Sequence, residues 1–116
     1  MSSPLVNLAA KLLAEEQNRR EAFDAGLPAL QRLVPIALGD TGQSMVVGRF
    51  LLGLFSSEYP FHLNTLRALD LEIFRDCLAV LQLDRYPEKD IHLYLVDGPA
   101  VFEKLKQRWT ANGGAQ

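Results

Sequence analysis

The segment from Gly39 to Ser44, GDTGQS, is the part of the chain that comes closest to a catalytic or nucleotide-binding loop. A phosphate-binding loop needs a lysine before its final serine or threonine and a strand in front of it, and this segment has neither. Asp40-Thr41-Gly42 matches the aspartic-protease triplet, but that chemistry needs an all-β dimer in which two aspartates share one proton. Because the flanking residues predict helices, we interpret the segment as a helix-to-helix turn.

Metal binding and nucleophilic catalysis would have to use Cys77, His62 and His92, the only cysteine and histidines of the chain. They cannot fill a tetrahedral zinc site without carboxylates, and no His-x-x-x-His or Cys-x-x-Cys spacing occurs. Cys77 could pair with either histidine as a nucleophile, but it lies in the apolar stripe of a predicted helix, where a thiol is usually buried and inert. We therefore expect no catalytic residue, no metal and no cofactor, and we expect that the protein is not an enzyme.

Asp40, Asp70 and Asp97 each stand directly before an apolar run with helical spacing. An aspartate in this position accepts hydrogen bonds from the first-turn N–H groups of a helix. Gln43, three residues after Asp40, completes the pattern of a capping box. The three aspartates therefore predict three helix starts rather than a set of paired catalytic acids.

The helix predicted at residues 41–56 is the element on which the others should pack. Its only charged residue is Arg49, and apolar side chains surround most of its axis. Such a helix is buried, and this one is shorter than the roughly 20 residues that span a bilayer. Gly48 and Gly53 indicate close approach of another backbone, because each costs a helix about 1 kcal/mol relative to alanine. The sequence predicts an all-α, compact single-domain bundle of about five to six helices around this buried helix.

The N-terminal helix is expected within residues 1–25, with Ser-Pro at its start and Gly26 at its end. Its polar part, residues 15–21, has no apolar face. The apolar stripe of its first half consists of Leu5, Leu8 and Leu12. In the simpler interpretation these leucines cover the core of their own chain. In the alternative the helix protrudes and they dock on another copy or on a partner.

Several further elements complete the predicted fold. A second helix should cover 27–38, with a kink or break at Pro35, and a short helix or turn should cover 63–69. In the helix predicted at 71–83, the side chains expected to face the core are Ile73, Phe74, Cys77, Leu78, Val80 and Leu81.

After a charged loop, residues 91–96 (IHLYLV) fit either a short extended segment or a short helix. A last helix follows Asp97, and residues 111–116 should form a disordered tail. The apolar face of the last helix consists of Val101, Phe102, Leu105 and Trp109.

The composition is that of an ordinary globular protein. The 116 residues are 48% hydrophobic and carry a net charge of −2, with acids and bases mixed along the chain. A slightly acidic protein has no long-range attraction for a polyanion, so nucleic acid is an unlikely partner. Since one cysteine cannot form an internal disulfide and the N-terminal apolar run is interrupted by charges, we expect a cytoplasmic protein without a membrane segment.

Helices at 27–38 and 41–56, joined by a glycine-containing turn, also have the layout of a helix-turn-helix. A small nucleic-acid-associated regulator is therefore the alternative function. Against it, Arg49 is the only cation of the second helix, and a better contact would be the basic end of the last helix. That basic end consists of Lys104, Lys106 and Arg108.

Several runs together resemble a family of small uncharacterised proteobacterial proteins that are often carried on conjugative or integrated elements. The runs are Gly39 to Leu52, Leu66 to Asp70, Cys77 to Leu81, and His92. The resemblance covers about residues 25–110 and leaves out the first helix. It implies an accessory role for a mobile element, such as modulation of a host protein, and it assigns no functional residue.

The absence of a catalytic pattern and the half-apolar first helix lead to one main hypothesis. We expect a non-catalytic helical protein that acts through protein–protein interaction, with a protein partner or through self-association. The candidate partner interface consists of Leu5, Leu8, Leu12, Arg49, Tyr59, Tyr86 and Trp109.

Overall fold

The structure, a computed structural model, describes residues 3–110. In that range the chain is all-α, as predicted, and contains no strand. The predicted disordered tail, 111–116, lies outside the described residues. The elements, in chain order, are α1 (Pro4–Ala37), α2 (Gly42–Phe55), the 3₁₀ helix η1 (Leu63–Ala68), α3 (Leu71–Arg85), the 3₁₀ helix η2 (Ile91–Tyr94) and α4 (Gly98–Trp109).

Helix α1 is a single helix of 34 residues, so the predicted end at Gly26 and the separate helix at 27–38 are wrong. Gly26 does not end the helix but allows α1 to pack closely on another helix. A Cβ added there would lie 2.5 Å from the Cβ of Leu83 and 3.0 Å from the carbonyl oxygen of Ala79, both on α3. The glycine therefore lets two helices approach each other, a use that a local sequence pattern cannot distinguish from a helix end.

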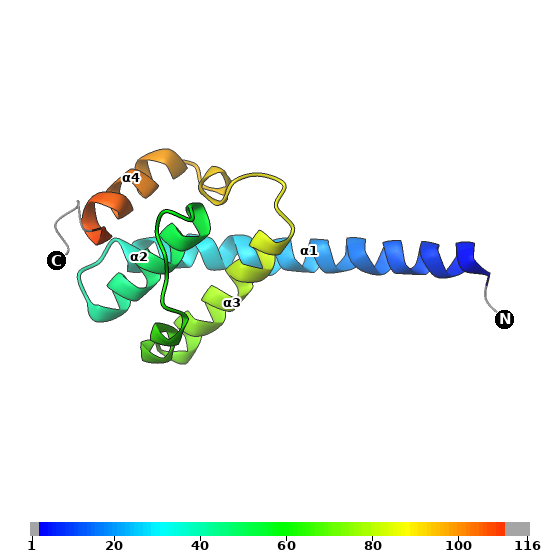
Figure 1. The fold of residues 1–116 in the computed structure, drawn as a ribbon, viewed down its shortest axis with the longest axis horizontal. Helices are drawn as coiled ribbons and strands as arrows, with labels where there is room; N and C mark the ends of the chain where they lie inside the picture. Colours follow the sequence, from blue (N-terminus) through cyan, green and yellow to red (C-terminus); the bar gives the residue numbers. More distant parts are fainter. Residues whose placement is uncertain (1–2, 111–116) are drawn as a thin grey trace.

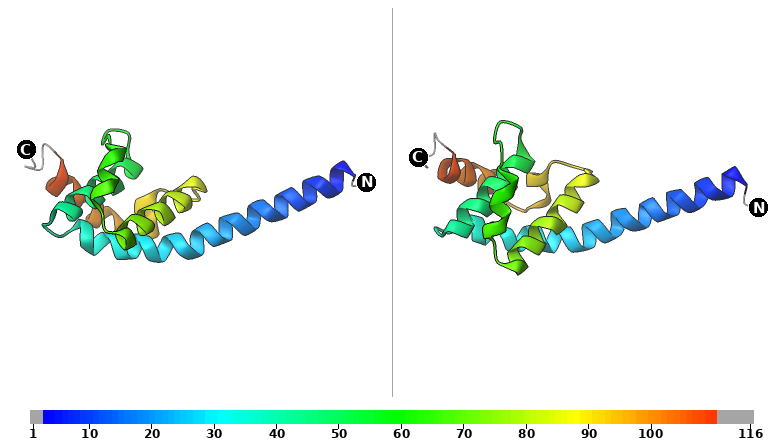
Figure 2. Two further views of the ribbon diagram at one scale, coloured as in Figure 1. Left: turned by 90° about the horizontal axis from the view of Figure 1, so that it is seen from below. Right: turned by 60° about the horizontal axis from the view of Figure 1, so that its bottom comes forward.

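The predicted break at Pro35 is also wrong. Pro28 and Pro35 both lie inside α1 and both are exposed. Each proline leaves one carbonyl a turn earlier without its N–H partner, and the residues concerned, Asp24 and Gln31, are on the exposed side, where water reaches them. The helix accordingly continues through both prolines and curves gently (Figure 2).

Helix α2 is the buried centre, as predicted. Seven of its residues are buried, and the helix contacts every other helical element of the described chain. Phe50, Leu51 and Leu52 lie in the core together with Leu30 and Leu33 of α1 and Phe102 of α4. Figure 1 shows α2 between α1, α3 and α4.

Capping differs from the prediction in detail. The N-cap of α2 is Thr41 rather than Asp40, and its hydroxyl accepts from the N–H of Ser44 at 3.0 Å. Gln43 does not close a capping box. Its amide instead exchanges two hydrogen bonds with Asp70: Nε2 donates to Oδ2 at 3.2 Å, and Oε1 accepts from the backbone N–H at 2.7 Å.

Asp70 and Asp97 do occupy N-cap positions, but neither side chain caps its helix. The carboxylate of Asp70 is turned toward Gln43, so it joins the start of α3 to the start of α2. The prediction of helix starts at these residues is confirmed, and the prediction of capping bonds is wrong.

Helix α3 turns a narrower face to the core than predicted. Cys77, Val80 and Leu83 are buried, whereas Leu78 and Leu81 are exposed, contrary to the prediction. The segment 91–96 contains the 3₁₀ helix η2 and no strand, so the extended alternative is wrong. A Cβ at Gly98 would collide with the backbone of His92, which shows how tightly η2 folds back on the start of α4.

The molecule is elongated because the first half of α1 leaves the other helices. Its principal extents are 62 × 27 × 23 Å and its radius of gyration is 16.7 Å, compared with about 13 Å for a compact domain of this length. The second half of α1 forms a compact head with α2, α3 and α4, while the first half extends from it alone (Figures 1 and 2).

Candidate partner-binding surfaces

The arm, residues 4–21, is the part of α1 that projects beyond the head. Every residue from 3 to 21 is exposed, and burial begins at Ala22. Leu5 is 78% exposed and Leu12 is 61% exposed, so the expectation that they cover their own core is wrong. At 1.5 Å per residue the arm is about 27 Å long. Its apolar stripe, called here the arm stripe, consists of Leu5, Val6, Leu8, Leu12 and Leu13.

The base of the arm is held to the loop after α3. The guanidinium of Arg19 lies 5.5 Å from the ring centre of Tyr86 and 3.7 Å from a carboxylate oxygen of Glu88. Arg85 approaches the same ring at 5.6 Å. Tyr86, predicted as a partner contact, is half-buried and lies against the base of the arm, which it supports.

A second apolar surface, called here the leucine groove, lies between η1 and α3. Its volume is about 790 Å³. Leu63 is 70% exposed and Leu71 is 59% exposed, values as high as those of the arm. The apolar side chains that line it are Leu63, Leu66, Leu69, Leu71, Phe74, Leu78 and Leu81.

The groove stays open because α3 packs on α1 with a different face. Leu83 and Ala79 of α3 lie against Gly26 of α1. Further along, Arg32 donates two hydrogen bonds to Asp76, at 3.0 and 2.8 Å. Residues later in α1 thus contact residues earlier in α3, so the two helices run in opposite directions. This pairing fixes the rotation of α3 and leaves its leucines facing outward.

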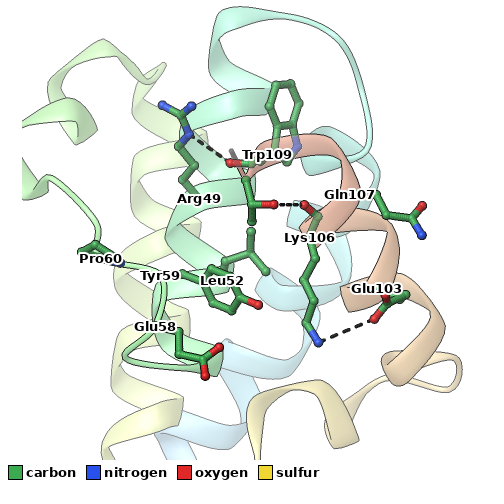
Figure 3. Close-up of a pocket in the computed structure, with 10 residues that line it drawn as sticks. Arg49, Leu52, Glu58, Tyr59, Pro60, Glu103, Lys106, Gln107 and Trp109 are labelled. Carbon is green, nitrogen blue, oxygen red and sulfur yellow. Dashed lines mark hydrogen bonds and ion pairs between the residues drawn. The ribbon is translucent and has the colours of Figure 1, made fainter. Parts of the chain in front are cut away.

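A third surface is a hollow between α2 and α4 of about 510 Å³ (Figure 3). Arg49 lies on its rim and donates from Nε to the carbonyl oxygen of Trp109 at 3.4 Å. The indole Nε1 of Trp109 donates to the carbonyl oxygen of Ala37 at 2.7 Å, and the ring lies over Gly48. Tyr59 lines the same hollow, so the structure brings together three predicted residues: Arg49, Tyr59 and Trp109.

These contacts assign Trp109 and Arg49 a structural role. The indole ties the end of α4 to the end of α1, and Arg108 adds a 2.7 Å hydrogen bond from its Nε to the carbonyl oxygen of Gly39. At the other wall of the hollow, Lys106 pairs with Glu103 at 3.6 Å and lies 4.8 Å from the ring centre of Phe55. Arg49, Lys106 and Glu103 at the hollow are thus engaged with one another or with the backbone, which favours a role in joining α4 to the rest of the head over ligand binding.

The predicted interface residues therefore do not form one patch. Leu5, Leu8 and Leu12 share the arm, Tyr86 stands at the base of the arm, and the other three lie at the hollow. Sequence reasoning missed the leucine groove. A signal was available, because Leu71, Phe74, Leu78 and Leu81 recur at intervals of three and four residues, which gives a second apolar stripe beside that of Cys77 and Val80.

The three residues considered for catalysis differ in how far they are buried. Cys77 is fully buried, and burial together with the neighbouring Asp76 raises the pKa of its thiol to about 12. The ring of His92 packs edge-on against Phe55 at 5.0 Å, while His62 is exposed. Within residues 3–110, no three His, Cys, Asp or Glu residues gather where they could hold a metal. A thiol held neutral in this way is a poor nucleophile and a poor metal ligand.

In the part of the chain that the structure describes, no helix has the combined length and apolarity needed to cross a bilayer.

A family of unknown function, DUF7673, matches residues 27–110. The chain belongs to this family. Searches of curated proteins and of solved structures found no match. The DUF7673 match contains α2, α3, α4 and the end of α1 from Leu27 onward, and therefore both the leucine groove and the hollow. The arm lies before it.

Proposed function

We propose that this DUF7673 member is a non-catalytic cytoplasmic protein that acts by binding another protein chain through its arm. The resemblance described above would make it an accessory of a bacterial mobile element that modulates a host protein. The observation that carries the proposal is the arm stripe, a row of large apolar side chains with 52% to 78% of their surface exposed on a helix that leaves the head.

An unpartnered amphipathic helix is a recurrent protein-recognition element. Such helices lay their apolar face into a groove of the partner, with contacts at positions i, i+3 and i+7. Leu5, Leu8 and Leu12 have this spacing. Five large apolar residues within ten positions also exceed the scattered exposure that is normal for a protein surface.

The test compares two doubly substituted full-length chains. Leu5→Glu with Leu12→Glu places two charges on the arm stripe. Asn7→Glu with Ala14→Glu places the same charges, at the same spacing, on the opposite face, where both residues are exposed. Each immobilised chain is incubated with native extract supplemented with an untagged copy of the wild-type chain, and bound proteins are identified by mass spectrometry.

We expect the wild type and the Asn7/Ala14 variant to retain the same protein, whether host protein or second copy, and the Leu5/Leu12 variant to lose it. Identical retention by all three chains would show that the arm stripe is not the binding surface. If none retained any protein, the proposed function would be wrong.

The nucleic-acid alternative finds less support. The helix-turn-helix pair does not exist as two separate units, because residues 27–37 are the end of α1, and α2 is too deeply buried to enter a groove of DNA. At the basic end of α4, Lys106 and Arg108 are engaged within the molecule. Binding to duplex DNA that weakens steeply as salt increases would revive this alternative.

A further inference from the structure

The leucine groove and the arm stripe are two unpartnered apolar surfaces on one chain, and they have matching patterns. The groove presents Leu71, Phe74 and Leu78 at intervals of three and four residues. The arm presents Leu5, Leu8 and Leu12 at the same intervals. Two helices with apolar residues at this spacing pack side by side with their side chains interdigitated.

The two surfaces also match in length. On α3 the groove extends from Leu71 to Leu81, about 15 Å, and the arm stripe extends from Leu5 to Leu13, about 12 Å, on an arm of about 27 Å. The arm could therefore cover the groove from end to end.

The arm cannot reach the groove of its own chain. Helix α1 is continuous, and its second half is fixed on the opposite face of α3 by the Gly26 contact and by the Arg32–Asp76 pair. Both views in Figure 2 show the arm pointing away from the head. Only another chain can bring an arm to this groove.

We propose that the occupant of the leucine groove is the arm of a second copy, and that two copies exchange arms in a twofold dimer. The inference rests on the proposed function and names the partner. A twofold axis that is perpendicular to α1, and displaced from it toward the side on which α3 lies, lays the arm of each copy along the head of the other. Because α3 runs opposite to its own α1, each arm then runs parallel to the α3 of the other copy. This orientation sets Leu5 beside Leu71 and Leu12 beside Leu78.

Reciprocal exchange uses both apolar surfaces of both chains at once. The exchange would cover, twice over, the five arm-stripe side chains, which are 52% to 78% exposed, and the groove leucines, which are up to 70% exposed. A single arm in a single groove would cover half as much, and stable protein–protein interfaces bury roughly 1,200–2,000 Å² in total. An unrelated partner on the arm alone would leave the groove exposed, whereas the exchange covers both the arm stripe and the leucine groove of each chain.

The main experiment measures mass by size exclusion with light scattering over a concentration series. The wild type should be dimeric, and so should the Asn7→Glu/Ala14→Glu control. The arm variant Leu5→Glu/Leu12→Glu and a groove variant, Leu71→Lys/Leu78→Lys, should each be monomeric. Mixing these two variants should restore a dimer. One of its two arm–groove contacts has the wild-type residues on both sides, and the other places the glutamates of the arm against the lysines of the groove. Circular dichroism of each variant reports whether it is folded.

A cross-link provides a second measurement that needs no destabilising charge. Chains carrying Leu12→Cys and Leu78→Cys are mixed under mild oxidation, with Leu12→Cys and Leu63→Cys as the mismatched pair. A disulfide between chains should form several-fold faster in the matched mixture. Equal rates in both mixtures would contradict the register.

Three outcomes would overturn the inference. A monomeric wild type at all concentrations would do so, while retention of a host protein through the arm would still support the proposed function. A groove variant that stays dimeric would show that arms pair with arms instead. A mixture of arm and groove variants that remains monomeric would show that neither surface receives the other.

Discussion

The substitution Gly26→Ala tests the packing of α1 on α3, the contact that fixes both the arm and the groove. The added Cβ would lie 2.5 Å from the Cβ of Leu83 and 3.0 Å from the carbonyl oxygen of Ala79. Neither atom is the free end of a flexible side chain, so one helix must move. Overpacking of this kind costs about 1–3 kcal/mol, and alanine returns about 1 kcal/mol of helix propensity. We expect a net loss of up to about 2 kcal/mol in the free energy of unfolding.

The assay is urea unfolding followed by circular dichroism, with Gly42→Ala as the matched control. A Cβ at Gly42 would meet no atom within 4 Å, so that substitution should be neutral or should stabilise by a few tenths to about 1 kcal/mol. If Gly26→Ala stabilised the protein as much as Gly42→Ala, Gly26 would be an ordinary exposed helix position. The packing of α1 on α3 described above would then be refuted.

Three further outcomes follow from single contacts. Gly48→Ala should shift the emission of Trp109 to the red, because the new methyl displaces the indole that lies over Gly48; an unchanged spectrum would contradict this. Cys77 should resist thiol reagents at pH 8 until the protein unfolds. Because the thiol ionises at a lower pH in the unfolded chain than in the folded one, the free energy of unfolding should fall as pH rises from about 9 toward the folded pKa of about 12. Thr41→Ala should cost about 1 kcal/mol and Asp40→Ala nearly nothing, measured by urea unfolding; the reverse order would restore Asp40 as the cap.

The buried centre could be predicted because its signal is local. Residues 41–56 are apolar on most sides, and no partner element has to be known to infer that they are buried. The same holds for the last helix, where Phe102 and Leu105 are buried as predicted. In both cases a single periodic pattern defines both the element and its environment.

The course of α1 could not be predicted, because glycine and proline have more than one use. Gly26 reads as a helix end only when the surface of α3 that it contacts is unknown. Pro35 reads as a break only when the exposed side of the helix is unknown. Both answers depend on residues about fifty positions away, and a local pattern does not contain them.

The leucine groove was missed for a related reason. On α3, core side chains and outward side chains are both apolar, so periodicity predicted one wide buried face. The Arg32–Asp76 pair and the contact of Leu83 with Gly26 fix which part of that face is covered by α1. Leu78 and Leu81 fall outside the covered part. An apolar face wider than its neighbours can cover is a candidate interface.

The arm is the part of the fold whose stability depends most on what covers it. Its internal support is modest: Gln17 donates to Glu21 at 2.9 Å, and Arg19 lies 3.6 Å from Glu16, contacts worth a few tenths of a kcal/mol each on an exposed helix. Helix propensity alone stabilises an exposed helical segment only weakly in water, and packing of an apolar face provides most helical stability in proteins. Whatever chain covers Leu5, Leu8 and Leu12 therefore also stabilises the helix that presents them. Association and helix formation in the arm are thus linked, and amide exchange across residues 4–21 should slow as the protein associates.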